Sequence, residues 1–179
     1  TVFEVLSKKR PYEAEIVIAN ADYEHVETNL LDKKYRNYSK KYWDKRTMSP
    51  SALLFYLGIN KKINIPHHCL FFDTNFNKHV EDIYDDPKWP DNPLFYVSCT
   101  SKTDSDVAPS ESEALFILIP VARDLTDEAA LRDKYLEQVL DRIEKKTGES
   151  IRENIVLSRS YAHKEFISVL NFLSKFINF

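Results

Sequence analysis

Apolar residues gather along the chain in short runs that predict a β-sheet. The runs span residues 51–58, 68–73, 94–100 and 113–121, with polar connections between them. Residues 51–58 and 113–121 are almost unbroken apolar stretches, which is typical of strands covered on both faces. Residues 155–159 form one more strand candidate near the end of the chain.

Between the strands, apolar residues recur at helical spacing. Residues 75–85 predict a helix with an apolar stripe made of Phe76, Val80, Ile83 and Tyr84. Residues 127–147 predict a long helix that Thr126 or Asp127 caps and that ends before Gly148 as the C′ residue. The inner face expected for this helix consists of Leu136, Val139, Leu140 and Ile143.

The two ends of the chain predict smaller elements. Residues 2–6 and 13–19 form a hairpin pattern, and Asp22 is placed to cap a helix that carries Tyr23, Val26 and Leu30 on one face. An amphipathic tail follows the last strand, with Phe166, Val169, Leu170, Leu173 and Phe176 on its apolar side. These elements together predict an α+β fold, with a mixed, largely antiparallel sheet on which the helices pack.

Composition narrows the function classes. The 179 residues include 25 basic and 28 acidic ones, so the net charge is −3, and this balance disfavours a nucleic-acid binder. Residues 33–46 are locally basic and aromatic, which fits a phosphate-binding surface or, more commonly, a solvated helix or loop over a protein core. The longest apolar stretch, residues 114–122, is half a membrane span.

Few residues offer chemistry of their own. The two glycines, Gly58 and Gly148, cannot form a phosphate-cradling loop, and Cys69 and Cys99 lie in apolar runs that favour reduced core thiols. His67 and His68 are expected on opposite faces of one strand, which disfavours a shared metal site and leaves open one histidine in a substrate cavity. The carboxylates at residues 81–86 favour a solvated helix face over acid–base work. The residues alone therefore predict an aromatic-rich domain of a cytosolic protein, with no self-contained active site and no metal site.

Four stretches, taken in order, resemble the bacterial-type phytoene desaturases, which are flavin-dependent carotenoid desaturases. The first is VIANADYEHVETNLL at residues 17–31, and the second is YWDKRTMSPSALLFYLG at residues 42–58. The third is PHHCLFFD at residues 66–73, and the fourth begins with PLFYVS at residue 93 and closes on FILIPV at residue 121. Each motif is weak alone, and their order and spacing over residues 13–160 make the resemblance specific.

The resemblance implies a two-dinucleotide-binding-type flavoprotein fold with an inserted substrate domain. Residues 1–22 would be a strand hairpin at the edge of the flavin domain, residues 23–160 the substrate-binding domain, and residues 161–179 a tail that departs from the family pattern. The glycine fingerprint for the FAD diphosphate is not in the sequence. The chain is therefore expected to be part of the enzyme, to hold no FAD alone and to be inactive alone.

The activity that the resemblance implies is desaturation of a C40 polyene such as phytoene at CH–CH groups. A hydride leaves an allylic carbon for flavin N5, and a proton leaves the neighbouring carbon. Because such substrates live in the bilayer, the whole enzyme is expected to be cytoplasmic and peripheral to a membrane surface. A related polyene oxidoreductase or isomerase acting on another carotenoid, or a non-catalytic interaction module, stays as the alternative.

The resemblance also implies positions for the site. Asn20, Ala21 and Asp22 would lie near the cofactor, and Phe55, Tyr56, His67 and His68 near the substrate, while no catalytic residue is carried over. One face of the sheet is expected to form the wall of a polyene channel with exposed aromatic side chains. The alternative is that a helix after Ala162 folds over that face and completes an ordinary core.

Overall fold

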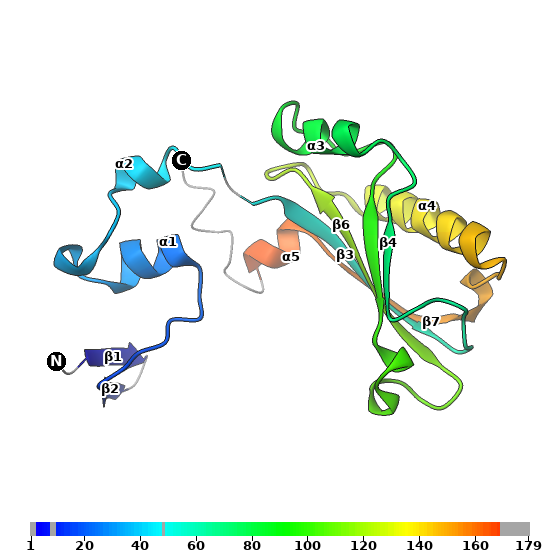
Figure 1. Ribbon diagram of the computed structural model, residues 1–179, viewed down its shortest axis with the longest axis horizontal. Coiled ribbons are helices and arrows are strands. Elements are labelled where there is room, and N and C mark those ends of the chain that lie inside the picture. The colour runs from blue at the N-terminus through cyan, green and yellow to red at the C-terminus, as the bar shows by residue number, and fades with distance from the viewer. Residues whose placement is uncertain (1–2, 8–9, 48, 169–179) are drawn as a thin grey trace. The chain divides into compact units, whose positions relative to one another are not determined.

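The computed structural model describes residues 3–7, 10–47 and 49–168 of the chain (Figure 1). The chain divides into two compact units, Thr1–Met48 and Ser49–Phe179. Each unit is described by itself below.

The first unit contains a hairpin and several short helical turns. Strands β1 (Phe3–Ser7) and β2 (Arg10–Ala14) pair antiparallel, and they are followed by α1 (Tyr23–His25), a π-turn (Val26–Leu30), a 3₁₀ turn (Lys33–Tyr35) and α2 (Lys40–Trp43). The hairpin and the Asp22 cap are confirmed, since the Asp22 carboxylate accepts from the His25 amide at 2.8 Å.

The predicted second arm of the hairpin, residues 13–19, is wrong beyond Ala14. Residues 16–20 are not in a strand, and Ile16 and Ile18 are 80% and 88% exposed. In the described part of the hairpin the ladder ends at the pair Phe3–Ala14, and β2 ends with it.

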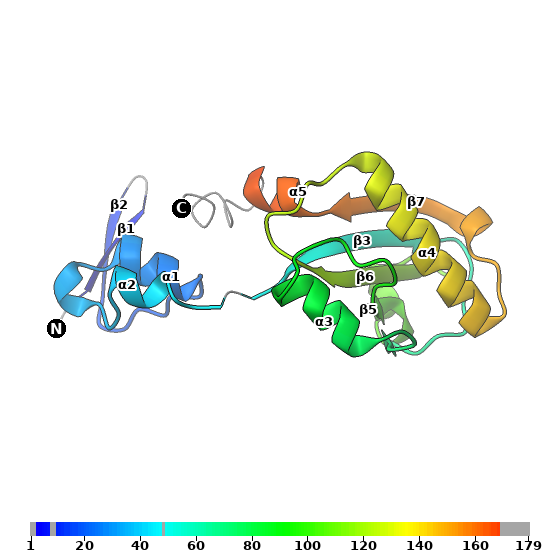
Figure 2. The same ribbon diagram turned by 90° about the horizontal axis from the view of Figure 1, so that it is seen from above.

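The second unit is a five-stranded antiparallel sheet with helices. The strands, in the order in which they lie in the sheet, are β4 (His68–Phe71), β5 (Phe95–Cys99), β6 (Glu113–Val121), β3 (Ser51–Ile59) and β7 (Ile155–Tyr161). The helices are α3 (Phe76–Tyr84), α4 (Ala129–Thr147) and α5 (His163–Ser168) (Figures 1 and 2). All five predicted strands and the α+β class are confirmed.

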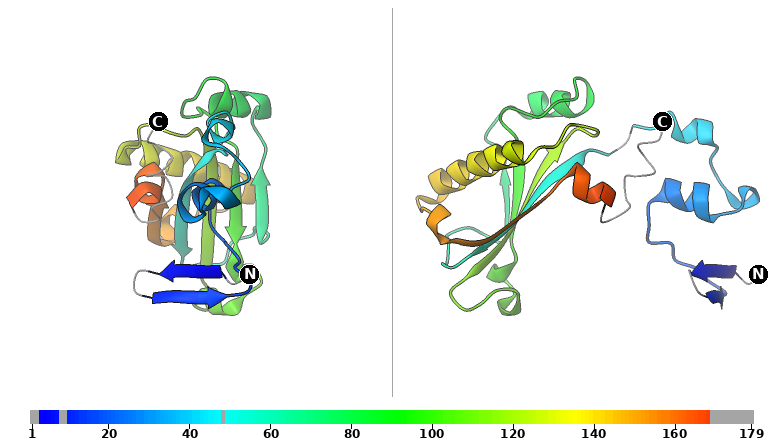
Figure 3. Two further views of the ribbon diagram at one scale, coloured as in Figure 1. Left: turned by 90° about the vertical axis from the view of Figure 1, so that its left-hand side faces the viewer. Right: turned by 180° about the vertical axis from the view of Figure 1, so that it is seen from behind.

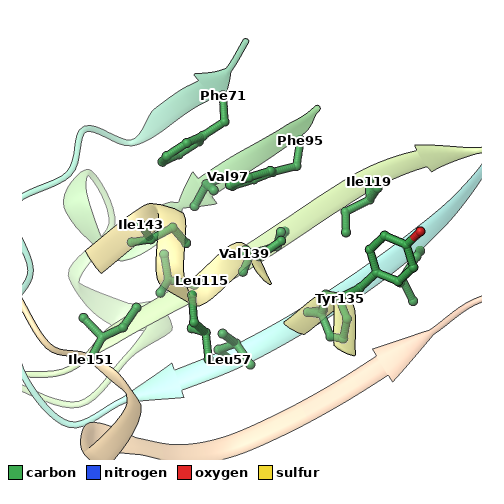
Figure 4. Packing of buried hydrophobic residues seen from close by; sticks show 14 of the residues in the cluster. Leu57, Phe71, Phe95, Val97, Leu115, Ile119, Tyr135, Val139, Ile143 and Ile151 are labelled. Atoms are coloured by element: carbon green, nitrogen blue, oxygen red, sulfur yellow. The ribbon is translucent and has the colours of Figure 1, made fainter. Parts of the chain in front are cut away.

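The core lies between one face of the sheet and α4, which runs along that face (Figure 3, right). Every second residue of β3 and β6 points inward, beginning with Leu53 and Leu115. Side chains of α4 meet them, as Figure 4 shows for Tyr135, Val139 and Ile143. Each such fully buried side chain contributes roughly 1.5–3 kcal/mol, so this layer holds the unit together.

Helix α4 confirms the predicted end but begins two residues later than predicted, at Ala129. Its cap residue is Glu128, whose side chain makes no capping hydrogen bond, while the Asp127 carboxylate is paired with Arg132. Gly148 ends the helix with φ 74°, a left-handed conformation that glycine adopts without strain.

Helix α3 forms as predicted, but the prediction of its buried face is wrong. His79 and Asp82 are buried, while Phe76 and Tyr84 of the apolar stripe are 55% and 46% exposed. The reason is hydrogen bonding to the sheet: His79 Nδ1 accepts from the Leu94 amide and Nε2 donates to the Pro120 carbonyl. These two bonds turn the polar side of α3 inward.

The tail is described only as far as Ser168. Helix α5 is fixed at the end of the sheet, because His163 Nε2 bonds the Ala122 carbonyl at 3.0 Å and Glu165 pairs with Arg132 at 2.7 Å. The predicted apolar positions Val169, Leu170, Leu173 and Phe176 lie outside the described residues. Within the described ranges, the helices are all too short or too polar to cross a bilayer.

Candidate functional site

The face of the sheet opposite α4 keeps an apolar surface that is partly open. Because side chains alternate along a strand, the residues between the core positions point to this face. They include Leu54, Leu118, Leu70 and Leu157, the last two 63% and 50% exposed. Such an apolar face marks an interaction or ligand-binding surface.

A row of six aromatic rings crosses this face. One ring comes from each strand and one from the loop before β4, in the order Tyr161, Tyr56, Phe116, Tyr96, His68 and His67. The successive centroids are 5.7, 5.2, 6.3, 5.9 and 4.1 Å apart. These spacings are those of attractive ring pairs, and four strand spacings of ~4.8 Å give the row a span of ~19 Å. We call this set the aromatic row.

The strand register explains how the row arises. Tyr56 of β3 lies opposite Phe116 of β6, and the next strand places Tyr96 one register step away, opposite Leu118. Directly opposed and diagonal residues of neighbouring strands share a face and lie within reach of aromatic side chains. Residues far apart in sequence thus line one surface.

One end of the aromatic row is polar. His68 Nδ1 and the Tyr96 hydroxyl share a hydrogen bond of 2.5 Å, and the Thr103 hydroxyl lies 2.7 Å from His67 Nδ1. The prediction that the two histidines point to opposite faces is wrong, since their rings stack at 4.1 Å. The reason is that His67 lies in a bend before β4, where strand alternation does not apply.

The other predicted site residues lie elsewhere. Phe55 is 2% exposed and packs in the core under α4, so the structure does not bring it together with Tyr56, His67 and His68. Asn20, Ala21 and Asp22 lie in the first unit, directly before α1, where Asp22 acts as the helix cap.

A buried polar cluster was missed by the sequence analysis. Glu113, 1% exposed, receives Lys102 Nζ at 2.5 Å and Ser101 Oγ at 2.5 Å. Burial raises the pKa of Glu113, but the hydrogen bonds from Lys102 and Ser101 outweigh it and hold the pKa below its usual value. The group serves the structure, because its carboxylate is fully engaged. The available signal was an acidic residue, Glu113, at the start of an apolar strand, with Ser101 and Lys102 in the loop that precedes it.

Two further groups have structural roles. Cys69 and Cys99 are free thiols, as predicted, and burial raises the pKa of both, which disfavours the reactive thiolate. Asp82 corrects the expectation of a wholly solvated carboxylate face, since it is buried and paired with Lys78 at 2.8 Å.

A further polar hollow lies outside the aromatic row, and the described residues contain no cluster that could hold a metal ion. The loop after β5 lines a polar hollow of about 460 Å³ that includes Lys62, Ser105 and Ser110. Over the described ranges, no group of three or more histidine, cysteine or acidic side chains is arranged to hold a metal ion. The aromatic row is therefore the candidate functional site of this chain, and it is a binding surface.

Comparison with known proteins gives the following relatives. The chain is 41% identical over 151 residues to a carotenoid 3,4-desaturase of Haloarcula japonica, covering 84% of this chain and 30% of that protein. It is 32% identical to a 4,4'-diapophytoene desaturase (4,4'-diapolycopene-forming) of Methylomonas sp, covering 78% and 28%. It is 25% identical to a phytoene desaturase (lycopene-forming) of Paracoccus sp., covering 93% and 34%.

The chain thus spans about a third of the length of these curated relatives. A scan against models of protein families matches none of them to the chain.

Proposed function

Because this chain belongs to the carotenoid and phytoene desaturases, of which it spans about a third, we propose that the whole protein introduces double bonds into a C40 polyene. The relatives are oxidoreductases. The finer assignment, to an FAD-dependent enzyme acting on CH–CH groups, is part of the proposal. The observation that carries it is the aromatic row on the open face of the sheet.

The role proposed for this chain is to bind and position the polyene. A hydrocarbon chain offers no hydrogen bonds, so burial of apolar area supplies its affinity at about 25 cal/mol per Å². Tyr56 and Phe116 at the centre of the row, with Leu54 and Leu118 beside them, offer such area on a rigid sheet. The same contacts keep water from the bound segment.

The residues described here do not fit an FAD diphosphate site. Such a site needs a glycine turn between a strand and a helix N-terminus. Gly58 lies within β3 and Gly148 ends α4, so neither is in that place. We propose that segments of the protein outside this chain hold the FAD, with Asn20, Ala21 and Asp22 approaching it.

The proposal also covers the domain boundaries, the activity of the isolated chain and the location of the whole protein. Residues 1–22 would belong to the edge of the flavin domain and residues 23–160 to the substrate-binding domain. The chain by itself would be inactive. Because a C40 polyene resides in the bilayer, the whole protein would be cytoplasmic and peripheral to a membrane.

The test uses the full-length protein in a bacterial strain that makes phytoene. The proposal predicts a coloured product with a longer conjugated system, and Tyr56→Ala combined with Phe116→Ala should lower the yield at least about tenfold, the effect of about 1.4 kcal/mol. The matched control is Phe76→Ala, an exposed aromatic of α3 outside the row. Unchanged phytoene with well-expressed wild-type protein, or a product of unchanged mass and altered double-bond geometry, would contradict desaturation.

A further inference from the structure

Residues 33–46 concentrate positive charge that polyene binding does not use. Seven of the 25 basic residues of the chain fall in this segment, with Asp44 as its one acidic residue, although the whole chain carries −3. Lys33, Lys41 and Lys45 are exposed. We call residues 33–46 the basic segment.

Aromatic rings lie among these charges. The rings of Tyr23, Tyr38, Tyr42 and Trp43 pack on one another with centroids 4.0–6.0 Å apart. Tyr35 is 55% exposed with Lys34 Nζ 4.8 Å from its ring centroid. Exposed tyrosine beside lysine is the combination that proteins present to the interface of a bilayer.

A buried carboxylate shapes the basic segment. Glu27 has no exposed surface, and its oxygens accept from the amides of Asn37 at 2.8 Å and Tyr38 at 3.0 Å. Burial raises the pKa of Glu27. The hydrogen bonds from these two backbone amides, together with hydrogen bonds from the Asn37 and Tyr23 side chains, outweigh burial and bring the pKa below its usual value. Glu27 therefore anchors the middle of the basic segment at Asn37 and Tyr38, which lowers the cost of ordering this part on a partner.

We propose that the basic segment docks the protein onto a bilayer that contains anionic lipids. Charge complementarity argues for an anionic partner. Lipid is favoured over nucleic acid because Tyr38 and Tyr42 stack on each other at 4.0 Å and 13°, so the faces that they share are closed to bases. The inference rests on the proposed function and deepens it, since it names a surface by which the protein would bind the bilayer that holds the polyene.

The docking contribution can be stated per side chain. A lysine near an anionic bilayer strengthens binding by about fivefold, which corresponds to about 1 kcal/mol. Replacing Lys33, Lys41 and Lys45 together by Gln should therefore weaken vesicle binding about 100-fold. The matched control replaces three exposed lysines of α4, Lys134, Lys145 and Lys146, by Gln and should leave binding within a few-fold of wild type.

The experiment sediments the full-length protein with vesicles. One preparation contains phosphatidylcholine alone and the other equal parts of phosphatidylcholine and phosphatidylglycerol. The proposal predicts binding to the anionic vesicles, weakened by salt and by the Lys33/Lys41/Lys45 variant. A parallel titration with single-stranded RNA should show weaker binding than the anionic vesicles.

Three results would overturn the proposal: equal binding to both vesicles, equal loss in the α4 control, or tighter binding to RNA. A second measurement, turnover of a polyene supplied in detergent, needs no bilayer and therefore distinguishes failure of membrane docking from failure of the proposed function. The basic-segment variant should retain it, whereas a wild-type protein that binds anionic vesicles without turning over polyene contradicts the proposed function alone.

Discussion

At the scale of single residues, Glu113 should make stability depend on pH. Its pKa is held below the ordinary 4.5, so it stabilises the fold above that value, and the contribution is lost as pH falls through the lower folded pKa. We expect Glu113→Gln to lower the free energy of unfolding by about 2 kcal/mol at neutral pH, because Lys102 loses its buried partner. Urea titrations at a series of acidic pH values measure this, and the free energy of unfolding of the variant should change less with pH than that of the wild type.

The control for this prediction is Glu149→Gln, whose carboxylate pairs with Lys61 at the surface. The two side chains are 32% and 30% exposed, so solvent screens the pair, and the free energy of unfolding of this variant at neutral pH should stay close to the wild-type value. A Glu113→Gln protein as stable as wild type, with unchanged pH dependence, would contradict the role assigned to this carboxylate.

The neighbouring residues Phe55 and Tyr56 show which part of the site a sequence pattern can predict. Alternation separates Phe55 from Tyr56 onto opposite faces, but it does not say which face the helices cover. That choice comes from α4, whose apolar side chains Val139 and Ile143 pack against the Phe55 face. The resemblance to the desaturases implied both residues near a substrate, while the structure keeps only Tyr56 on the open face.

At the scale of elements, Gly148 is required for the end of α4. With φ 74° it adopts a conformation that strains residues with a β-carbon. Gly148→Ala should lower the free energy of unfolding by about 1 kcal/mol. Gly148→Asn should lower it less, because asparagine tolerates this conformation. Thermal or urea unfolding of the two variants measures the difference, and equal losses would point to something other than backbone conformation.

The sequence predicts the long helices and strands, but it does not predict hydrogen bonds between residues that are distant in the chain. The strands and α4 follow from long apolar runs and helical periodicity. The inward turn of α3 depends on two hydrogen bonds of His79 to backbone groups of Leu94 and Pro120, which are distant in sequence. The end of β2 at Ala14 likewise coincides with the last described pair of the hairpin ladder, Phe3–Ala14.

At the scale of the whole molecule, the chain is expected to need the rest of its protein for the cofactor. Purified as residues 1–179, it should be colourless and bind FAD weakly or not at all, because neither glycine lies at a strand-to-helix turn. Absorbance after gel filtration with added FAD measures this. A yellow complex with one FAD per chain would contradict the division of labour proposed above.

Photo-crosslinking shows whether the polyene lies on the aromatic row. Tyr56 is replaced by p-benzoylphenylalanine in the full-length protein, and Phe76, exposed on α3 outside the row, is replaced in a control. After irradiation with bound phytoene, mass spectrometry should find the polyene adduct at position 56 and not at position 76. An adduct at position 76 alone, or none at 56 in a protein that still converts phytoene, would contradict the account.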